Sequence, residues 1–241
     1  MTRETPDQAP EGSQDQPSRR EQLLEVSVFL FLILPSIVFS FFLFGPWQKH
    51  FDFAQFAVSS ILDYLALVAL IFFFAWRNQE PLARLGWNFR NGWKDVALGI
   101  TLFFPYIMGI GLLFIIYWKL GFPLPMKPIP QFFIPREGQT LLALVLVCVV
   151  AIAEETIFRG YLLLRFRAIL GSSRGAILLS SAIFALGHGY KGLAGVIVTF
   201  LMGVFYAVLY LRRQSLVSPI VIHFLQDFIL VLIPLFGLKI A

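Results

Sequence analysis

Long apolar runs separated by short polar connectors dominate the pattern along the chain. A helix that crosses a bilayer needs about 20 mostly apolar residues. Seven stretches approach or reach that length: residues 25–45, 54–76, 96–118, 140–163, 175–189, 193–211 and 216–236. The stretch 175–189 is the short one. The pattern therefore predicts an all-α fold, a polytopic transmembrane helical bundle with about seven spans.

The polar segments complete this plan. Residues 1–22 are rich in Pro, Gln, Glu and Ser and contain almost nothing that could be buried, which predicts a disordered cytoplasmic tail. The connector 77–95 mixes Trp, Phe and basic residues, as interfacial segments do. The connector 119–139 has five prolines and is expected to be an irregular loop. Residues 23–241 are expected to form a single transmembrane bundle.

Composition excludes a soluble globular domain. Hydrophobic residues make up 58% of the chain and charged residues 14%, with a mean hydropathy of +0.79, which indicates an integral membrane protein. The net charge of +5 does not indicate a nucleic-acid partner, because the Lys and Arg residues are spread over short connectors. Cys148 is the only cysteine, so no intramolecular disulfide forms, and its apolar surroundings favour simple packing.

The basic residues also predict an orientation. With the N-terminus in the cytoplasm, the inside segments carry twelve Lys and Arg residues and the outside segments six. Cytoplasmic connectors of membrane proteins are enriched in these residues. The chain is therefore expected to be a multi-pass protein of the plasma (inner) membrane with its N-terminus in the cytoplasm.

A few ionisable residues interrupt the apolar runs. Each costs about 2–4 kcal/mol at the centre of a lipid-exposed helix, so each is expected to face the bundle interior and usually a partner. These residues are Asp63, Glu154, Glu155, Arg159, His188, His223 and Asp227. Six of the seven lie in the C-terminal half of the chain, which makes that half the predicted functional region.

Helical spacing predicts two pairs among these residues. Glu155 and Arg159 are four residues apart and therefore neighbours on one helical face, as are His223 and Asp227. Glu154 is turned by about 100° from Glu155 and stays available. A buried Glu–Arg pair can equally be a structural clasp, and a His beside a helix end is often satisfied locally.

Depth along the helices supports a common level. At about 1.5 Å per residue, Glu154, His188, His223 and Asp227 lie roughly 15 to 21 Å from the basic connectors at 165–174 and 212–213, so they can meet. Asp63 has a similar depth. It either joins this cluster or caps a water or a neighbouring polar side chain.

Three short motifs carry a resemblance to a known family. They are Glu154-Glu155-x-x-x-Arg159, Phe184-x-x-x-His188 and His223-x-x-x-Asp227, in this order on three predicted helices. This set resembles the CPBP family of intramembrane proteases, which includes the type II CAAX prenyl endopeptidases and the bacteriocin-processing or Abi proteins. The resemblance covers about residues 140–230.

The resemblance implies an endopeptidase that acts on a peptide or lipidated protein substrate. Glu154 and His188 would activate a water, while His223 and Asp227 would stabilise the oxyanion or complete the site. Asp227 departs from the Asn common in the prenyl-protease branch, and an ionised Asp cannot donate a hydrogen bond to an oxyanion. Peptide hydrolysis does need a base and an oxyanion donor, so the residue types suit this chemistry.

The metal question and two other functions stay open. Glu154, His188 and His223 could hold zinc with an open fourth position, although the HExxH motif is absent; we favour a metal-free Glu and His site. A proton-coupled transporter also buries such residues along its path, but no inverted repeat is apparent. A catalytically silent immunity or scaffold membrane protein is the third interpretation.

Overall fold

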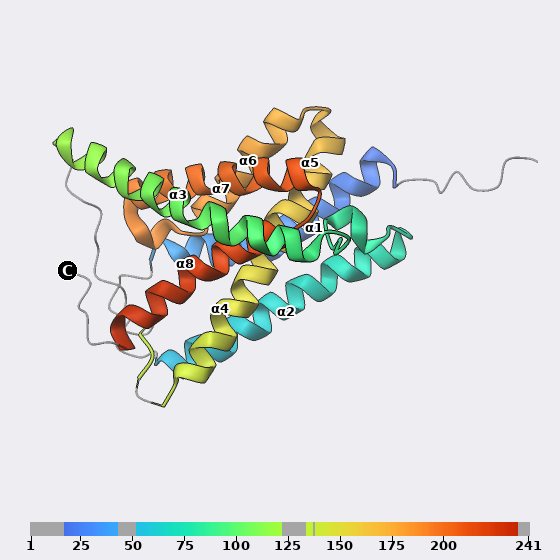
Figure 1. Cartoon of the computed structure of the whole chain (residues 1–241). Coiled ribbons are helices and arrows are strands. Elements are labelled where there is room, and N and C mark those ends of the chain that lie inside the picture. The colour runs from blue at the N-terminus through green and yellow to red at the C-terminus, as the bar shows by residue number, and fades with distance from the viewer. Residues whose placement is uncertain (1–16, 43–51, 122–133, 137, 236–241) are drawn as a thin grey trace, which may run out of the picture.

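Seven apolar helical segments follow one another in the computed structural model, which describes residues 17–42, 52–121, 134–136 and 138–235 (Figure 1). They are α1 (Arg19–Ser40), α2 (Phe53–Arg77), α3 (Gly92–Lys119), α4 (Thr140–Glu155) continued by α5 (Leu163–Leu170), α6 (Ser173–Leu186), α7 (Gly192–Arg213) and α8 (Val217–Leu235). Five segments of the described chain are long and apolar enough to cross a membrane, and α6 and the described part of α8 are shorter apolar helices. The predicted all-α membrane bundle is confirmed.

The first span begins earlier than the sequence pattern predicts. Ser18 caps α1 through a capping box with Glu21, so the last residues of the predicted tail 1–22 are helical from Arg19 onward. Residues 1–16 of that tail lie outside the described residues. Most of the predicted loop 119–139 also lies outside them.

The helices pack so that the C-terminal motifs come together. Helix α8 lies between α3 and α4, α2 runs along α4, and α6 packs against both α5 and α7 (Figure 1). Two short 3₁₀ helices, η2 (Leu82–Leu85) and η5 (Gly189–Lys191), connect the spans. The helices that carry the two glutamates and the His223 motif are therefore in direct contact.

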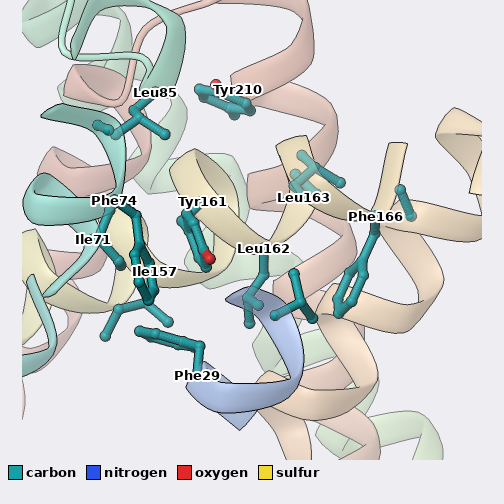
Figure 2. Close-up of a cluster of buried hydrophobic side chains, with 14 of the residues drawn as sticks. Phe29, Ile71, Phe74, Leu85, Ile157, Tyr161, Leu162, Leu163, Phe166 and Tyr210 are labelled. Carbon is teal, nitrogen blue, oxygen red and sulfur yellow. The ribbon is translucent and has the colours of Figure 1, made fainter. Parts of the chain in front are cut away.

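A buried apolar cluster holds α1, α2 and the α4–α5 segment together. Phe29 of α1 and Phe74 of α2 both contact the ring of Tyr161, with centroid distances of 5.2 and 6.1 Å. Leu85 of η2 and Tyr210 of α7 close the same cluster (Figure 2). This packing fixes the chain segment that immediately follows the two glutamates.

That segment is a π-helix, η4 (Thr156–Leu162), inserted between α4 and α5. A β-carbon added at Gly160 would lie 2.6 Å from the carbonyl oxygen of Leu85, so glycine permits the close approach of η2. Short π-helical insertions are rare and occur frequently at functional sites. Here the insertion directly follows Glu154 and Glu155.

Ion pairs gather the basic connectors at one end of the bundle, called the basic end below. Arg165 of α5 makes two hydrogen bonds to Glu80, of 2.9 and 2.6 Å, and lies 3.3 Å from Glu25 of α1. Arg213, at the end of α7, pairs with Asp95 of α3 at 2.7 Å. These contacts bring the connector 77–95 together with Arg165 and with Arg213.

Candidate active site

Glu154 and Glu155 end helix α4 in the interior of the bundle. Their exposed fractions are 6% and 0%, although the chain around them is apolar. Their burial needs polar partners, because an uncompensated charge inside a bundle is costly. The partners come from η4, α2 and α8.

Glu155 connects the two motifs that the sequence treats separately. Its Oε1 accepts hydrogen bonds of 2.9 Å from Arg159 Nη1 and of 2.9 Å from His223 Nδ1. The predicted Glu155–Arg159 pair is therefore present. The contact between Glu155 and His223 was not predicted, because helical spacing says nothing about neighbours on other helices.

Aromatic rings hold Arg159 and His223 in place. The guanidinium carbon of Arg159 lies 4.3 Å from the centre of the Phe184 ring and 5.0 Å from that of Tyr206. Tyr206 also stacks on the His223 ring at 5.7 Å, and its hydroxyl lies 2.8 Å from that of Tyr106 on α3. A planar guanidinium suits this stacked position better than an ammonium would.

The other nitrogen of His223 faces two more carboxylates. Its Nε2 lies 3.4 Å from Asp227 Oδ2 and 3.6 Å from Glu154 Oε2. The predicted His223–Asp227 pair is thus present at ion-pair distance, with Glu154 beside it. Both ring nitrogens point at carboxylate oxygens, an arrangement in which an imidazolium can donate from each of them.

Helical spacing predicts that Glu154 stays available, but in the structure it has a hydrogen-bond partner. The hydroxyl of Tyr64 on α2 donates a hydrogen bond to its Oε1. Its Oε2 is buried and has no hydrogen-bond partner among the described residues. A carboxylate oxygen that is buried, unpartnered and near an imidazole is a suitable place for a water molecule.

The sequence suggested Asp63 as a possible member of this cluster, and Tyr64, the next residue along the chain, was not predicted. Asp63 is exposed on the outside of α2, so its membership of the cluster is corrected here, and Tyr64 takes the place instead. The helical spacing offered a signal, because Tyr64 lies seven residues from both Ala57 and Ile71, which are fully buried. Positions seven apart share a helical face.

His188 lies beside the cluster without touching Glu154. Its ring is 4.9 Å from that of Phe184, which in turn is 6.2 Å from His223. Its Nδ1 lies 2.9 Å from the carbonyl oxygen of Phe184, a contact that requires the proton on Nδ1. The Nε2 of a neutral ring is then an acceptor.

The structure does not assemble the zinc set that the sequence left open. Among the described residues no group of three His, Cys, Asp or Glu side chains is placed to hold a metal ion. His223 directs Nδ1 to Glu155, and His188 directs Nδ1 to the carbonyl oxygen of Phe184. The donors of Glu154, His188 and His223 therefore do not fit a metal centre in this arrangement, and no step is derived through one.

Positive and negative charges are nearly balanced among the buried ionisable side chains around His223. Three carboxylates, those of Glu154, Glu155 and Asp227, are countered by Arg159 and by His223 when it is protonated. Lys191, the last residue of η5, also interacts electrostatically with Asp227 and Glu154. Such a group can hold water and move a proton below the membrane surface.

Comparison with known proteins gives one finding. Residues 136–229 match the family model described as type II CAAX prenyl endopeptidase, Rce1-like. The matched range includes every residue of the three motifs and excludes α1, α2 and α3. No curated protein and no solved structure matches the chain.

Proposed function

Since residues 136–229 form a domain of the Rce1-like type II CAAX prenyl endopeptidase family, we propose that the protein is an intramembrane endopeptidase. It hydrolyses a peptide bond of a membrane-associated substrate. The observation that carries this proposal is the buried, unpartnered Oε2 of Glu154, which lies 3.6 Å from His223 Nε2.

In the first step, a water bound at Glu154 Oε2 attacks the carbonyl carbon of the scissile bond and gives its proton to that oxygen. His188 orients this water through its Nε2. A positioned base of this kind contributes about 10²- to 10⁴-fold to a reaction rate. The new C–O bond leaves a negative charge on the former carbonyl oxygen.

His223 stabilises that oxyanion, and Asp227 orients the His223 ring. The imidazole donates from Nε2, so Asp227 need not donate to the oxyanion itself. Glu155 accepts from Nδ1 and is itself held by Arg159, while Tyr206 stacks on the His223 ring. In the second step the C–N bond breaks, Glu154 gives its proton to the leaving amine, and the products are a carboxylic acid and an amine.

The test compares membranes from cells that contain the wild-type protein, Glu154→Gln or His188→Ala. New protein termini that appear only with the wild type identify both the activity and the substrate by mass spectrometry. Either variant should lower their yield by about 10²- to 10⁴-fold while the protein still accumulates. Glu21→Gln is the matched control, because Glu21 is exposed on α1 and Gln also fits its capping box.

The other interpretations give different results. A scaffold or immunity protein would keep its full biological effect in both variants. A transporter would show substrate-driven proton flux in liposomes and no new peptide termini. Cleavage is also expected to continue in excess metal chelator, since no three His, Cys, Asp or Glu side chains among the described residues are placed to hold a metal ion.

A further inference from the structure

The hydrogen bond between Tyr64 and Glu154 links the family domain to a helix outside it. Tyr64 lies on α2, and the family match begins at residue 136. We propose that Tyr64 is a positioning residue of the hydrolase. It determines which oxygen of Glu154 is anchored and which one holds the water. This inference rests on the proposed function.

Helix α2 is a rigid support for this contact. Its first turn is fixed by a capping box between Asp52 and Gln55. Ala57 is fully buried in a cluster with Ala143 and Val147 of α4, and Ile71 is fully buried in the cluster around the π-helix. Tyr64 lies midway between these two anchored positions on the same helical face, so its hydroxyl is held at the level of Glu154.

The contact makes the two oxygens of Glu154 different. Oε1 accepts from the Tyr64 hydroxyl, whereas Oε2 has no partner among the described residues and lies toward His223. Without Tyr64, the carboxylate could turn about its last torsion angle, which is a soft one. Both oxygens could then compete for His223 Nε2, and neither would be reserved for the water.

The same bond directs the proton during the reaction. Tyr64 keeps its own proton throughout and donates to Oε1 in every state. When the water gives up a proton, that proton must therefore go to Oε2, on the side of the scissile bond. The neutral acid still accepts from Tyr64 through Oε1, and Oε2 returns the proton to the leaving amine. Tyr64 thus positions Glu154 without touching the substrate.

Tyr64→Phe is the direct test, because it removes one hydroxyl and keeps the ring that packs against the apolar cluster. The probe is a farnesylated peptide that ends in a CAAX box, with release of the terminal peptide measured by mass spectrometry. The variant should lower kcat roughly 10- to 100-fold, as small misplacements of a reacting group do. KM should stay unchanged, since Tyr64 contacts Glu154 rather than the peptide.

A second readout does not depend on catalysis. Dicyclohexylcarbodiimide modifies protonated carboxyl groups in apolar surroundings, and peptide mapping separates Glu154 from Glu155. A hydrogen bond donated to a carboxylate favours its ionised form, so Tyr64→Phe should increase labelling of Glu154 severalfold at a fixed pH. If the wild type does not cleave the peptide but this increase occurs, Tyr64 still positions Glu154 and the farnesylated peptide is not the substrate; absence of new protein termini in the membrane comparison is what counts against the proposed function.

Tyr210→Phe is the matched control. Tyr210 is buried in the same apolar cluster, near Leu85 and Gly86, and no hydrogen bond of its hydroxyl occurs among the described residues. This variant should leave kcat and labelling unchanged. The proposal is overturned if Tyr64→Phe also leaves both unchanged, or if its activity falls only in proportion to the amount of folded protein.

Discussion

Arg159 is the residue on which the burial of Glu155 depends most directly. Its guanidinium is 1% exposed, pairs with Glu155 and lies between the rings of Phe184 and Tyr206. Three carboxylates lie within this small region. Without the Arg159 cation, only His223 would offset the mutual repulsion of these three carboxylates.

Arg159→Ala is therefore expected to lower the free energy of unfolding by about 3–5 kcal/mol, the usual cost of removing one partner of a buried ion pair. Arg159→Lys should recover only part of this loss, because an ammonium cannot reproduce the planar, stacked geometry. Chemical denaturation in detergent micelles measures both effects. Arg174→Ala, at an exposed position of α6, serves as control and should change stability by less than about 0.5 kcal/mol.

An Arg159→Ala protein that unfolds at the wild-type denaturant concentration would contradict the structural role given to this pair. The result would also separate stability from catalysis. Glu154→Gln should remain folded and inactive, whereas Arg159→Ala should be inactive because less of it is folded.

At this scale the sequence predicted pairs within a helix but not contacts between helices. Glu155–Arg159 and His223–Asp227 follow from four-residue spacing. The bond from Tyr64 to Glu154 and the bond from His223 to Glu155 depend on how α2 and α8 pack against α4. A tyrosine in an apolar helix is common enough that its type alone indicates no function.

At the scale of the elements, the π-helix after the two glutamates is the most specific feature. Gly160 lets the Leu85 carbonyl approach to a distance that a β-carbon would not allow. Hydropathy predicts the span 140–163 because length and composition determine it. It does not predict the π-helical insertion, since the insertion depends on the packing of η2 and α2 against that turn.

Gly160→Ala is expected to destabilise the protein by about 1–3 kcal/mol, as overpacking of a tight contact does. The neighbouring atom is a backbone oxygen that cannot move aside alone. Thermal unfolding in detergent measures the effect. Gly109→Ala on α3 is the matched control, because an added β-carbon there meets nothing within 4 Å and alanine is the better helix former.

Gly109→Ala should therefore be as stable as the wild type or slightly more stable. Equal unfolding temperatures for the two variants would show that the approach of Leu85 to the π-helix is not tight in the membrane. A lower temperature for Gly160→Ala with normal accumulation would support the role of the turn in placing Glu154 and Glu155.

At the scale of the whole molecule, the predicted bundle is confirmed, because seven apolar stretches leave few alternatives for a chain in a bilayer. The basic end brings together Glu25, Glu80 and Arg165, and separately Asp95 and Arg213. Distance along the helices also indicated how deep Glu154 lies in the bundle. Glu154 lies eleven residues beyond the level of Arg165, or about 16 Å along the axis, which is close to half the thickness of the hydrocarbon core.

The remaining expectation at this scale is that the basic end faces the cytoplasm. Green fluorescent protein fused after Asn91 or after Gln214, both at the basic end, should be fluorescent. Alkaline phosphatase fused at the same positions should be inactive. A fusion after Leu120, at the opposite end of α3, should give the reverse. These outcomes follow from the excess of Lys and Arg in cytoplasmic connectors.

The orientation also bears on the substrate. With the basic end inside, a lipidated substrate anchored in the cytoplasmic leaflet must extend its peptide about 16 Å into the bundle to reach Glu154. The opposite pattern of fusion activities would place that path on the outer side instead. Farnesylated CAAX peptides presented from the cytoplasmic face would then be the wrong substrate class, while the geometry of Glu154, His223 and Tyr64 would be unaffected.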